Sequence, residues 1–198
     1  MKLLKNADYD YVTNGITEEN GYTKWYDWTT VRKHTRIIYM ILMLMLVITA
    51  FAFRNLLRGT VGVRSFLKII LVGILFWLAV ITPLHEILHL LPLSKGKLDS
   101  KCIITVGKGT ASALYNGHTK YCDHLISLIL PFSVIFVLLG AVTVLTKGTV
   151  SFFFLYLLIL SSLGSYTDVY MFFYSMKHIG KNDVIFGLYK KEQKQLKN

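Results

Sequence analysis

His85, Glu86 and His89 form an H-E-x-x-H sequence, read as His85-Glu86-Ile87-Leu88-His89. On a helix, residues four apart lie on one face, so two imidazoles at this spacing can reach one zinc ion. The glutamate between them is the residue type that accepts a proton from a zinc-activated water. The motif therefore predicts a hydrolytic zinc site with His85 and His89 as metal ligands and Glu86 as the general base.

The motif lies near the end of an apolar run, Phe66–Leu91, that is long enough to cross a membrane. Ionisable side chains are costly in a membrane span and usually have a function there. A buried polar network without metal is the structural alternative. Pro83 precedes the motif and predicts a kink that makes room for metal and water, and Pro92 predicts the end of the helix.

The elements that position the motif are membrane helices. Of the 198 residues, 54% are hydrophobic, which is typical of a membrane protein. The fold class expected is an all-α membrane protein with four transmembrane helices and a small β-like cytoplasmic loop between the second and third. The four apolar runs are Ile37–Phe53, Phe66–Leu91, Leu125–Leu145 and Val150–Phe173. We expect a polar, interfacial N-terminal segment (1–36) that contains Trp25, Tyr26 and Trp28, a membrane domain (37–176) and a basic tail (177–198).

The basic residues are distributed unevenly between the two sides that this topology defines. The N-terminus, the loop Leu93–His124 and the C-terminus hold 17 Lys and Arg, and the other side holds four or five of the 22. The positive-inside rule places both termini and the loop in the cytoplasm of a multi-pass protein of the plasma membrane. The net charge of +11 then reflects contact with the lipid bilayer and not with nucleic acid. The sequence favours no particular oligomeric state.

Glycines divide the polar residues 94–124 into short β-like stretches, Cys102–Val106 and Ser112–Tyr115. They predict a small hairpin whose edge could pair with an extended peptide. A plain connecting loop without such a role is an equally weighted alternative. Cys102 and Cys122 lack the spacing of a zinc pair and are interpreted as ordinary thiols.

A catalytic zinc site needs a third protein ligand. Asp168 is the only carboxylate in the third or fourth apolar run. Helix lengths place it at a membrane depth similar to that of His85, so Asp168 is the predicted third ligand. A hydrogen-bonded packing carboxylate is the alternative. A soluble metzincin arrangement fits less well, because Pro92 and Lys95 occupy the positions of its glycine and third histidine.

At these residues the chain resembles the putative zincin peptidase family of small bacterial membrane proteins, and more distantly the site-2 type of intramembrane metalloprotease. The resemblance covers roughly Phe66 to Phe173 and includes a span with Pro131. It implies Zn²⁺ held by His85, His89 and Asp168, with Glu86 as catalytic base. Site-2 proteases usually carry glycine after the third ligand, whereas Val169 follows Asp168 here.

The leading hypothesis is a membrane-embedded zinc metalloendopeptidase that cuts membrane-associated proteins near the cytoplasmic face. A non-catalytic accessory or adaptor protein that retains a zinc-binding or remnant site is the alternative of another class. A haem or metal carrier is less favoured, because His85 and His89 on one helix cannot be opposite axial ligands of one haem.

Overall fold

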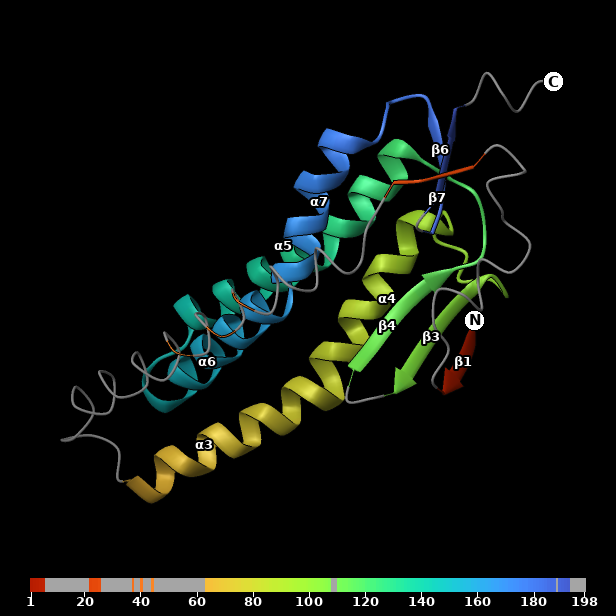
Figure 1. The fold of residues 1–198 in the computed structure, drawn as a ribbon. Helices are drawn as coiled ribbons and strands as arrows, with labels where there is room; N and C mark the ends of the chain where they lie inside the picture. Colours follow the sequence, from red (N-terminus) through yellow and green to blue (C-terminus); the bar gives the residue numbers. More distant parts are fainter. Residues whose placement is uncertain are drawn as a thin grey trace. The chain divides into compact units, whose positions relative to one another are not determined.

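The computed structural model describes residues 1–5, 22–25, 37, 40, 44, 63–107, 110–187 and 189–192. Figure 1 labels the helices and strands and colours them along the sequence. The chain divides into two units, each made of segments distant in sequence. Unit 1 comprises Met1–Tyr26, Thr82–Ser133 and Asp168–Asn198, and unit 2 comprises Asp27–Ile81 and Val134–Thr167. All three predicted metal ligands and Glu86 belong to unit 1.

The second apolar run forms three successive helical segments, α3 (Val63–Phe76), the π-helical turn η2 (Trp77–Ile81) and α4 (Thr82–Leu93). Pro83 has no N–H to offer the carbonyl of Ala79, four residues earlier, and its ring crowds that carbonyl. A wider π-helical turn accommodates such an interruption. The predicted irregularity thus lies one turn before His85, and α4 ends one residue after Pro92.

The third apolar run forms one helix, α5 (Tyr121–Leu145), but the fourth is broken into α6 (Gly148–Gly164) and α7 (Tyr166–His178). The two helices are bent by 41°. Ser162 and Ser165 donate hydroxyl hydrogen bonds to the carbonyls of Leu158 and Ser161, and such bonds compete with the helical ladder. The expected single fourth helix, Val150–Phe173, is therefore two helices that meet at Ser165.

Two described helices, Lys68–Leu93 and Tyr121–Leu145, are long and apolar enough to cross a membrane, with mean hydropathies of 2.0 and 2.7. The bent pair α6–α7 makes a third if it acts as one span. The protein is thus mostly helical with two or three candidate spans in its described part. The predicted first span, Ile37–Phe53, lies outside the described residues except at Ile37, Met40 and Leu44.

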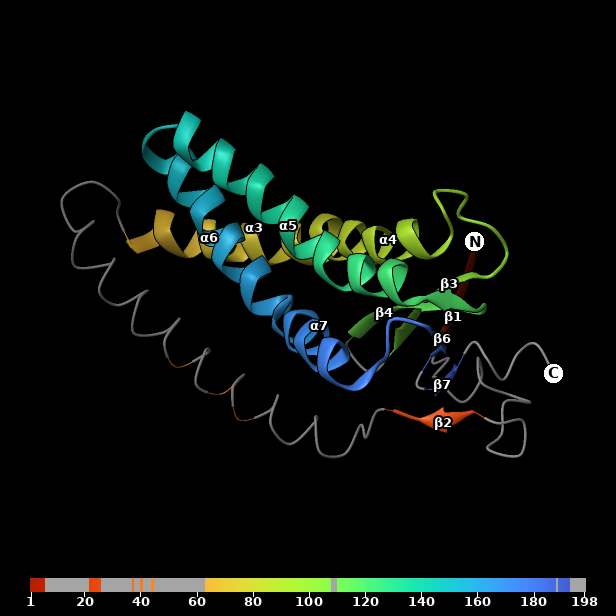
Figure 2. The same ribbon diagram turned by 90° about the horizontal axis from the view of Figure 1, so that it is seen from above.

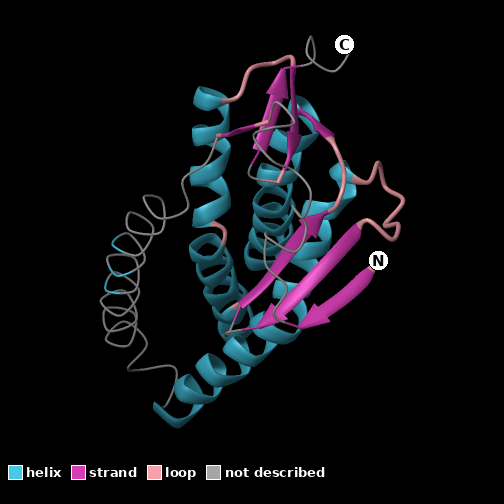
Figure 3. Cartoon of the chain, turned by 45° about the vertical axis from the view of Figure 1, so that its right-hand side comes forward, coloured by secondary structure: helices cyan, strands magenta, loops and turns pink. Residues whose placement is uncertain are grey.

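A three-stranded sheet of unit 1 has the order β1-β3-β4 (Figure 3). Its strands are β1 (Lys2–Lys5), β3 (Cys102–Gly107) and β4 (Thr110–Tyr115). β3 and β4 pair antiparallel, and β1 joins β3 in parallel. The predicted hairpin is confirmed, and the chain's first residues extend it.

A second sheet has the order β2-β7-β6-β5 and was not expected from the sequence. Its strands are β2 (Thr23–Lys24), β7 (Tyr189–Glu192), β6 (Asp183–Phe186) and β5 (Thr119–Lys120). Figure 2 shows β2, β6 and β7 close to the end of α7. These strands have only two or four residues each, and β2, β5 and β7 contain lysine, so the set lacks the long apolar alternation by which strands are found in a sequence. The expected all-α class with one β-like loop thus becomes a mostly helical class with two small sheets.

The core of unit 1 joins the two sheets and packs α4 against the first. Tyr22, Ile103, Leu114 and Phe186 form one buried cluster. A second cluster contains Leu90 of α4 and Cys102 and Ile104 of β3. Trp25, which was expected at headgroup depth, is buried against His124 and Tyr174, while Tyr26 and Trp28 lie outside the described residues. The half of the second apolar run that carries the H-E-x-x-H motif is thus covered by protein on its sheet side.

Candidate metal centre

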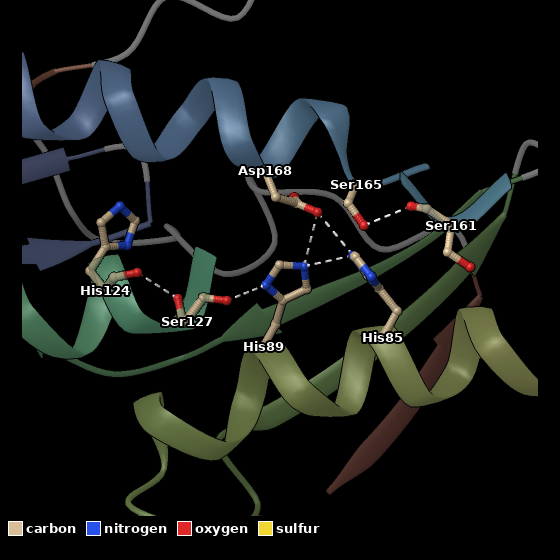
Figure 4. Close-up of polar contacts among 7 residues, drawn as sticks. All are labelled: His85, His89, His124, Ser127, Ser161, Ser165 and Asp168. Atoms are coloured by element: carbon tan, nitrogen blue, oxygen red, sulfur yellow. Dashed lines mark hydrogen bonds and ion pairs between the residues drawn. The ribbon is translucent and has the colours of Figure 1, made fainter. Parts of the chain in front are cut away.

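His85 and His89 project from one face of α4 toward a common point (Figure 4). Their Nε2 atoms are 3.1 Å apart, and the ring centroids are 4.8 Å apart with the ring planes at 80°. The helical spacing produces this approach, because residues four apart lie one above the other on a helix. Both side chains are largely buried, with 14% and 13% of their surface exposed.

Asp168 reaches the same point from the first turn of α7. Its Oδ2 atom lies 2.9 Å from Nε2 of His85 and 3.4 Å from Nε2 of His89. The break at Ser165 gives Asp168 a position at a helix N-terminus, where a carboxylate is favoured by the unpaired peptide N–H groups. The structure brings together the three residues that the sequence predicts as ligands.

The donor set fits a tetrahedral zinc ion. Zinc binds histidine nitrogen and carboxylate oxygen at about 2.0–2.2 Å, which places two tetrahedral ligand atoms about 3.3 Å apart. The three distances among the donor atoms, 2.9, 3.1 and 3.4 Å, lie close to this separation. Two histidines and one carboxylate also leave one position for a water or substrate, as in catalytic zinc sites. Among the residues that the structure describes, these are the only three His, Cys, Asp or Glu side chains so grouped.

The second ring nitrogen of His89, Nδ1, also has a hydrogen-bond partner. Nδ1 lies 2.7 Å from the backbone carbonyl oxygen of Ser127 in α5. A carbonyl only accepts, so Nδ1 carries the hydrogen and Nε2 presents its lone pair toward His85 and Asp168. This partner was not foreseen from the sequence, because a backbone carbonyl has no residue-type signature. Such outer contacts fix the tautomer and the orientation of metal-binding histidines.

Glu86 lies between the two histidines in sequence and is 8% exposed. Its carboxylate is within electrostatic range of His85, His89 and Asp168, and it has a hydrogen-bonding interaction with the backbone N–H of Ala113 in β4. The strand therefore holds the carboxylate beside the three ligands. This backbone contact also was not foreseen.

The remaining histidines and cysteines that the structure describes have other surroundings. His118 contacts Tyr22, His124 contacts Ser175 and His178 contacts the Tyr174 carbonyl. Both cysteines are free. Burial raises the pKa of the Cys102 thiol, which favours the protonated form that binds metals poorly. The free state of both cysteines agrees with the interpretation of Cys102 and Cys122 as ordinary thiols.

A family model described as "Putative zincin peptidase" matches residues 78–180, slightly more than half of the chain. The chain belongs to this family. The matched segment contains α4, the β3–β4 hairpin, α5 and Asp168, so all four predicted site residues of this zincin peptidase family member lie within it. Neither the curated proteins nor the solved structures contain a match to the chain.

Proposed function

We propose that the protein is a membrane-embedded zinc metalloendopeptidase with His85, His89 and Asp168 as metal ligands and Glu86 as general base. The observation that carries the proposal is the convergence of three donor atoms within 3.4 Å of one another, next to a buried glutamate. Burial of these four ionisable side chains costs free energy, and the proposal gives each of them a role. Ionisable residues within membrane spans usually have such a function.

Bound Zn²⁺ would polarise a peptide carbonyl and lower the pKa of its water to about 7. Glu86 accepts the proton of the attacking water and passes it to the leaving amine. The Ala113 N–H orients the Glu86 carboxylate during this transfer. The Ser127 carbonyl holds the ring of His89 in one orientation.

The substrate that we propose is an extended segment of a membrane-associated protein, cut near the cytoplasmic face. β4 is the outer strand of its sheet, and no other described strand pairs with its second edge. The same strand reaches Glu86 through Ala113. A peptide paired along this edge would pass the general base, because an exposed strand edge offers a row of backbone hydrogen-bonding groups.

Zinc content and cleavage of a membrane-inserted peptide test the proposal. The purified chain should hold about one zinc ion, and His85→Ala should lose it. Glu86→Gln should keep the zinc and lose cleavage, because the amide cannot accept the proton. Asp123→Asn, an acid in the first turn of α5, serves as the control for charge removal and should change neither property.

Two outcomes contradict the proposal. A wild-type chain that stays metal-free after incubation with zinc is no zinc enzyme. A chain that binds zinc but cleaves no membrane peptide, with or without Glu86, matches the accessory protein that retains a site.

A further inference from the structure

We infer that Pro131 is a positioning residue for the metal centre, because it leaves the Ser127 carbonyl free to accept the hydrogen of His89 Nδ1. The inference rests on the proposed zinc site and adds a residue that touches none of the reacting atoms. It is built from three described features of unit 1: the His89–Ser127 contact, the position of Pro131 in α5, and the burial of both α5 residues.

The first step is the hydrogen-bond pattern of α5. In an α-helix the carbonyl of residue i accepts from the N–H of residue i+4. The partner of the Ser127 carbonyl would be residue 131, which is a proline inside the helix. Proline has no N–H, so the ladder lacks this one bond. The carbonyl that lacks its partner is the one that lies 2.7 Å from His89 Nδ1.

The second step is the specificity of the position. Successive residues of an α-helix are turned by about 100°. A proline one residue earlier or later would free the carbonyl of Ile126 or Leu128, which points to another side of α5. Only a proline at position 131 frees the carbonyl that faces His89.

The third step is burial. Pro131 is fully buried, and Ser127 is 3% exposed, so water is excluded from the freed carbonyl. A buried carbonyl without a partner is unfavourable. The Ser127 hydroxyl cannot replace the missing bond, since it donates to the His124 carbonyl at 2.8 Å. His89 therefore satisfies the carbonyl, and the carbonyl fixes the tautomer of His89.

Three variants of the full-length chain in detergent test this role. Pro131→Ala returns an N–H that competes with His89 for the Ser127 carbonyl. Its zinc affinity, measured by competition with a chelator, should fall by about 10–100-fold, the usual effect of losing an outer partner. Gly140→Ala is the control in the same helix, since a Cβ there meets nothing within 4 Å, and it should bind zinc as the wild type does. Lactic acid at position 131, introduced by nonsense suppression, lacks the N–H and should restore wild-type affinity.

The tautomer of His89 gives a readout without metal. Imidazole ¹⁵N shifts of the metal-free chain should show hydrogen on Nδ1 in the wild type, the Gly140→Ala variant and the lactic acid variant, and a tautomer mixture in Pro131→Ala.

Wild-type zinc affinity in Pro131→Ala overturns the inference. A lactic acid variant that binds zinc as weakly as Pro131→Ala also overturns it, because the loss of affinity would then come from the shape of proline and not from the missing N–H. If Pro131→Ala does not fold, the lactic acid variant alone decides, with wild-type affinity in favour and reduced affinity against. A wild-type chain that binds no zinc instead refutes the proposed function, and the ¹⁵N shifts still decide the role of Pro131.

Discussion

His89 is constrained at both ring nitrogens. Its Nδ1 atom contacts the Ser127 carbonyl at 2.7 Å, and its Nε2 atom lies within 3.4 Å of His85 and Asp168 donor atoms. A ring held in this way loses little rotational freedom when a ligand binds, and such preorganisation increases affinity. The site is thus arranged before any metal arrives.

Asp168→Asn should reduce zinc affinity by more than the roughly 10–100-fold that follows loss of an outer partner. The amide is neutral and a weaker metal ligand than the carboxylate it replaces, although its shape is the same. Chelator competition measures the effect, with Asp123→Asn as the matched control. Equal zinc affinity in the two variants would remove Asp168 from the ligand set.

The sequence predicts the side-chain members of the site but not the backbone members. His85, Glu86 and His89 have a spacing that acts through helix geometry alone. Asp168 is identified by the scarcity of buried acids. Ser127 and Ala113 act through backbone groups, so their residue types carry no information. Pro131 is the one trace of this arrangement in the sequence, and its meaning depends on knowing which carbonyl faces His89.

The break between α6 and α7 is an element that the sequence did not predict. Its residues, Ser161-Ser162-Leu163-Gly164-Ser165, are compatible with a continuous membrane helix, since serine hydroxyls can bond within such helices. The interruption of the helix at Ser165 is therefore seen in the three-dimensional structure and is not predicted by the sequence. The consequence is that Asp168 is in the first turn of a new helix and not in the middle of a long one.

Ala111→Pro should raise KM for a membrane peptide about tenfold or more, with kcat and zinc content little changed. Backbone N–H groups alternate between the two edges of a strand, and the Ala113 N–H faces Glu86, so the Ala111 N–H faces the same outer edge. Proline removes this donor without breaking the ladder to β3. Peptide-cleavage kinetics at varied substrate concentration measure the change.

Ala111→Val controls for added bulk, because it keeps the N–H. The two variants should differ clearly in KM. The same KM in both would show that the outer edge of β4 does not bind the substrate through its backbone.

Gly73→Ala should destabilise unit 2, by about 1–3 kcal/mol as for other overpacked contacts. A Cβ at Gly73 would lie 2.8 Å from two ring atoms of Tyr156, and glycine at such a helix contact allows close approach. Thermal unfolding in detergent measures the change. Gly140→Ala, where a Cβ has open space, should not lower the midpoint, and an equal loss in both variants would refute the contact.

At the scale of the whole molecule, the two units have different surfaces. Most of the exposed large apolar side chains of the described residues belong to unit 2, including Leu71, Leu75, Val137 and Val144. Most of the buried apolar side chains belong to unit 1. An exposed apolar surface is what lipid solvates. Unit 1 thus has most of the buried apolar core of the described residues, and it also contains the candidate metal centre.

The four-stranded sheet joins chain segments that the charge distribution assigns to one side of the membrane. β2 comes from the N-terminal segment, β5 from the loop before α5, and β6 and β7 from the C-terminal segment. Strands that pair directly cannot lie on opposite sides of a bilayer. If the candidate span Lys68–Leu93 crosses the membrane, an even number of crossings must separate Lys24 from Thr119, and the predicted run Ile37–Phe53 would supply the second one.

Single cysteines should report this topology in a Cys102→Ser, Cys122→Ser background. Cysteines that replace Lys24, Lys120 and Lys181 should react with an impermeant maleimide from one side of the membrane only. Lys147→Cys, in the turn between α5 and α6, should react from the other side. Labelling of intact cells and of inverted vesicles separates the two sides. Opposite labelling of any two of the first three positions would contradict the shared side.

The distance along the chain between His85 and Asp168 has a consequence for biogenesis. The two residues are 83 positions apart, so at about 5–20 residues per second the histidine pair leaves the ribosome roughly 4–17 s before its acidic partner. A nascent chain that ends before α7 has both predicted histidine ligands and Glu86, the predicted general base, but lacks the Asp168 carboxylate. Under the proposed function, the complete set of three metal ligands therefore exists only at the last stage of synthesis, after Asp168 has left the ribosome.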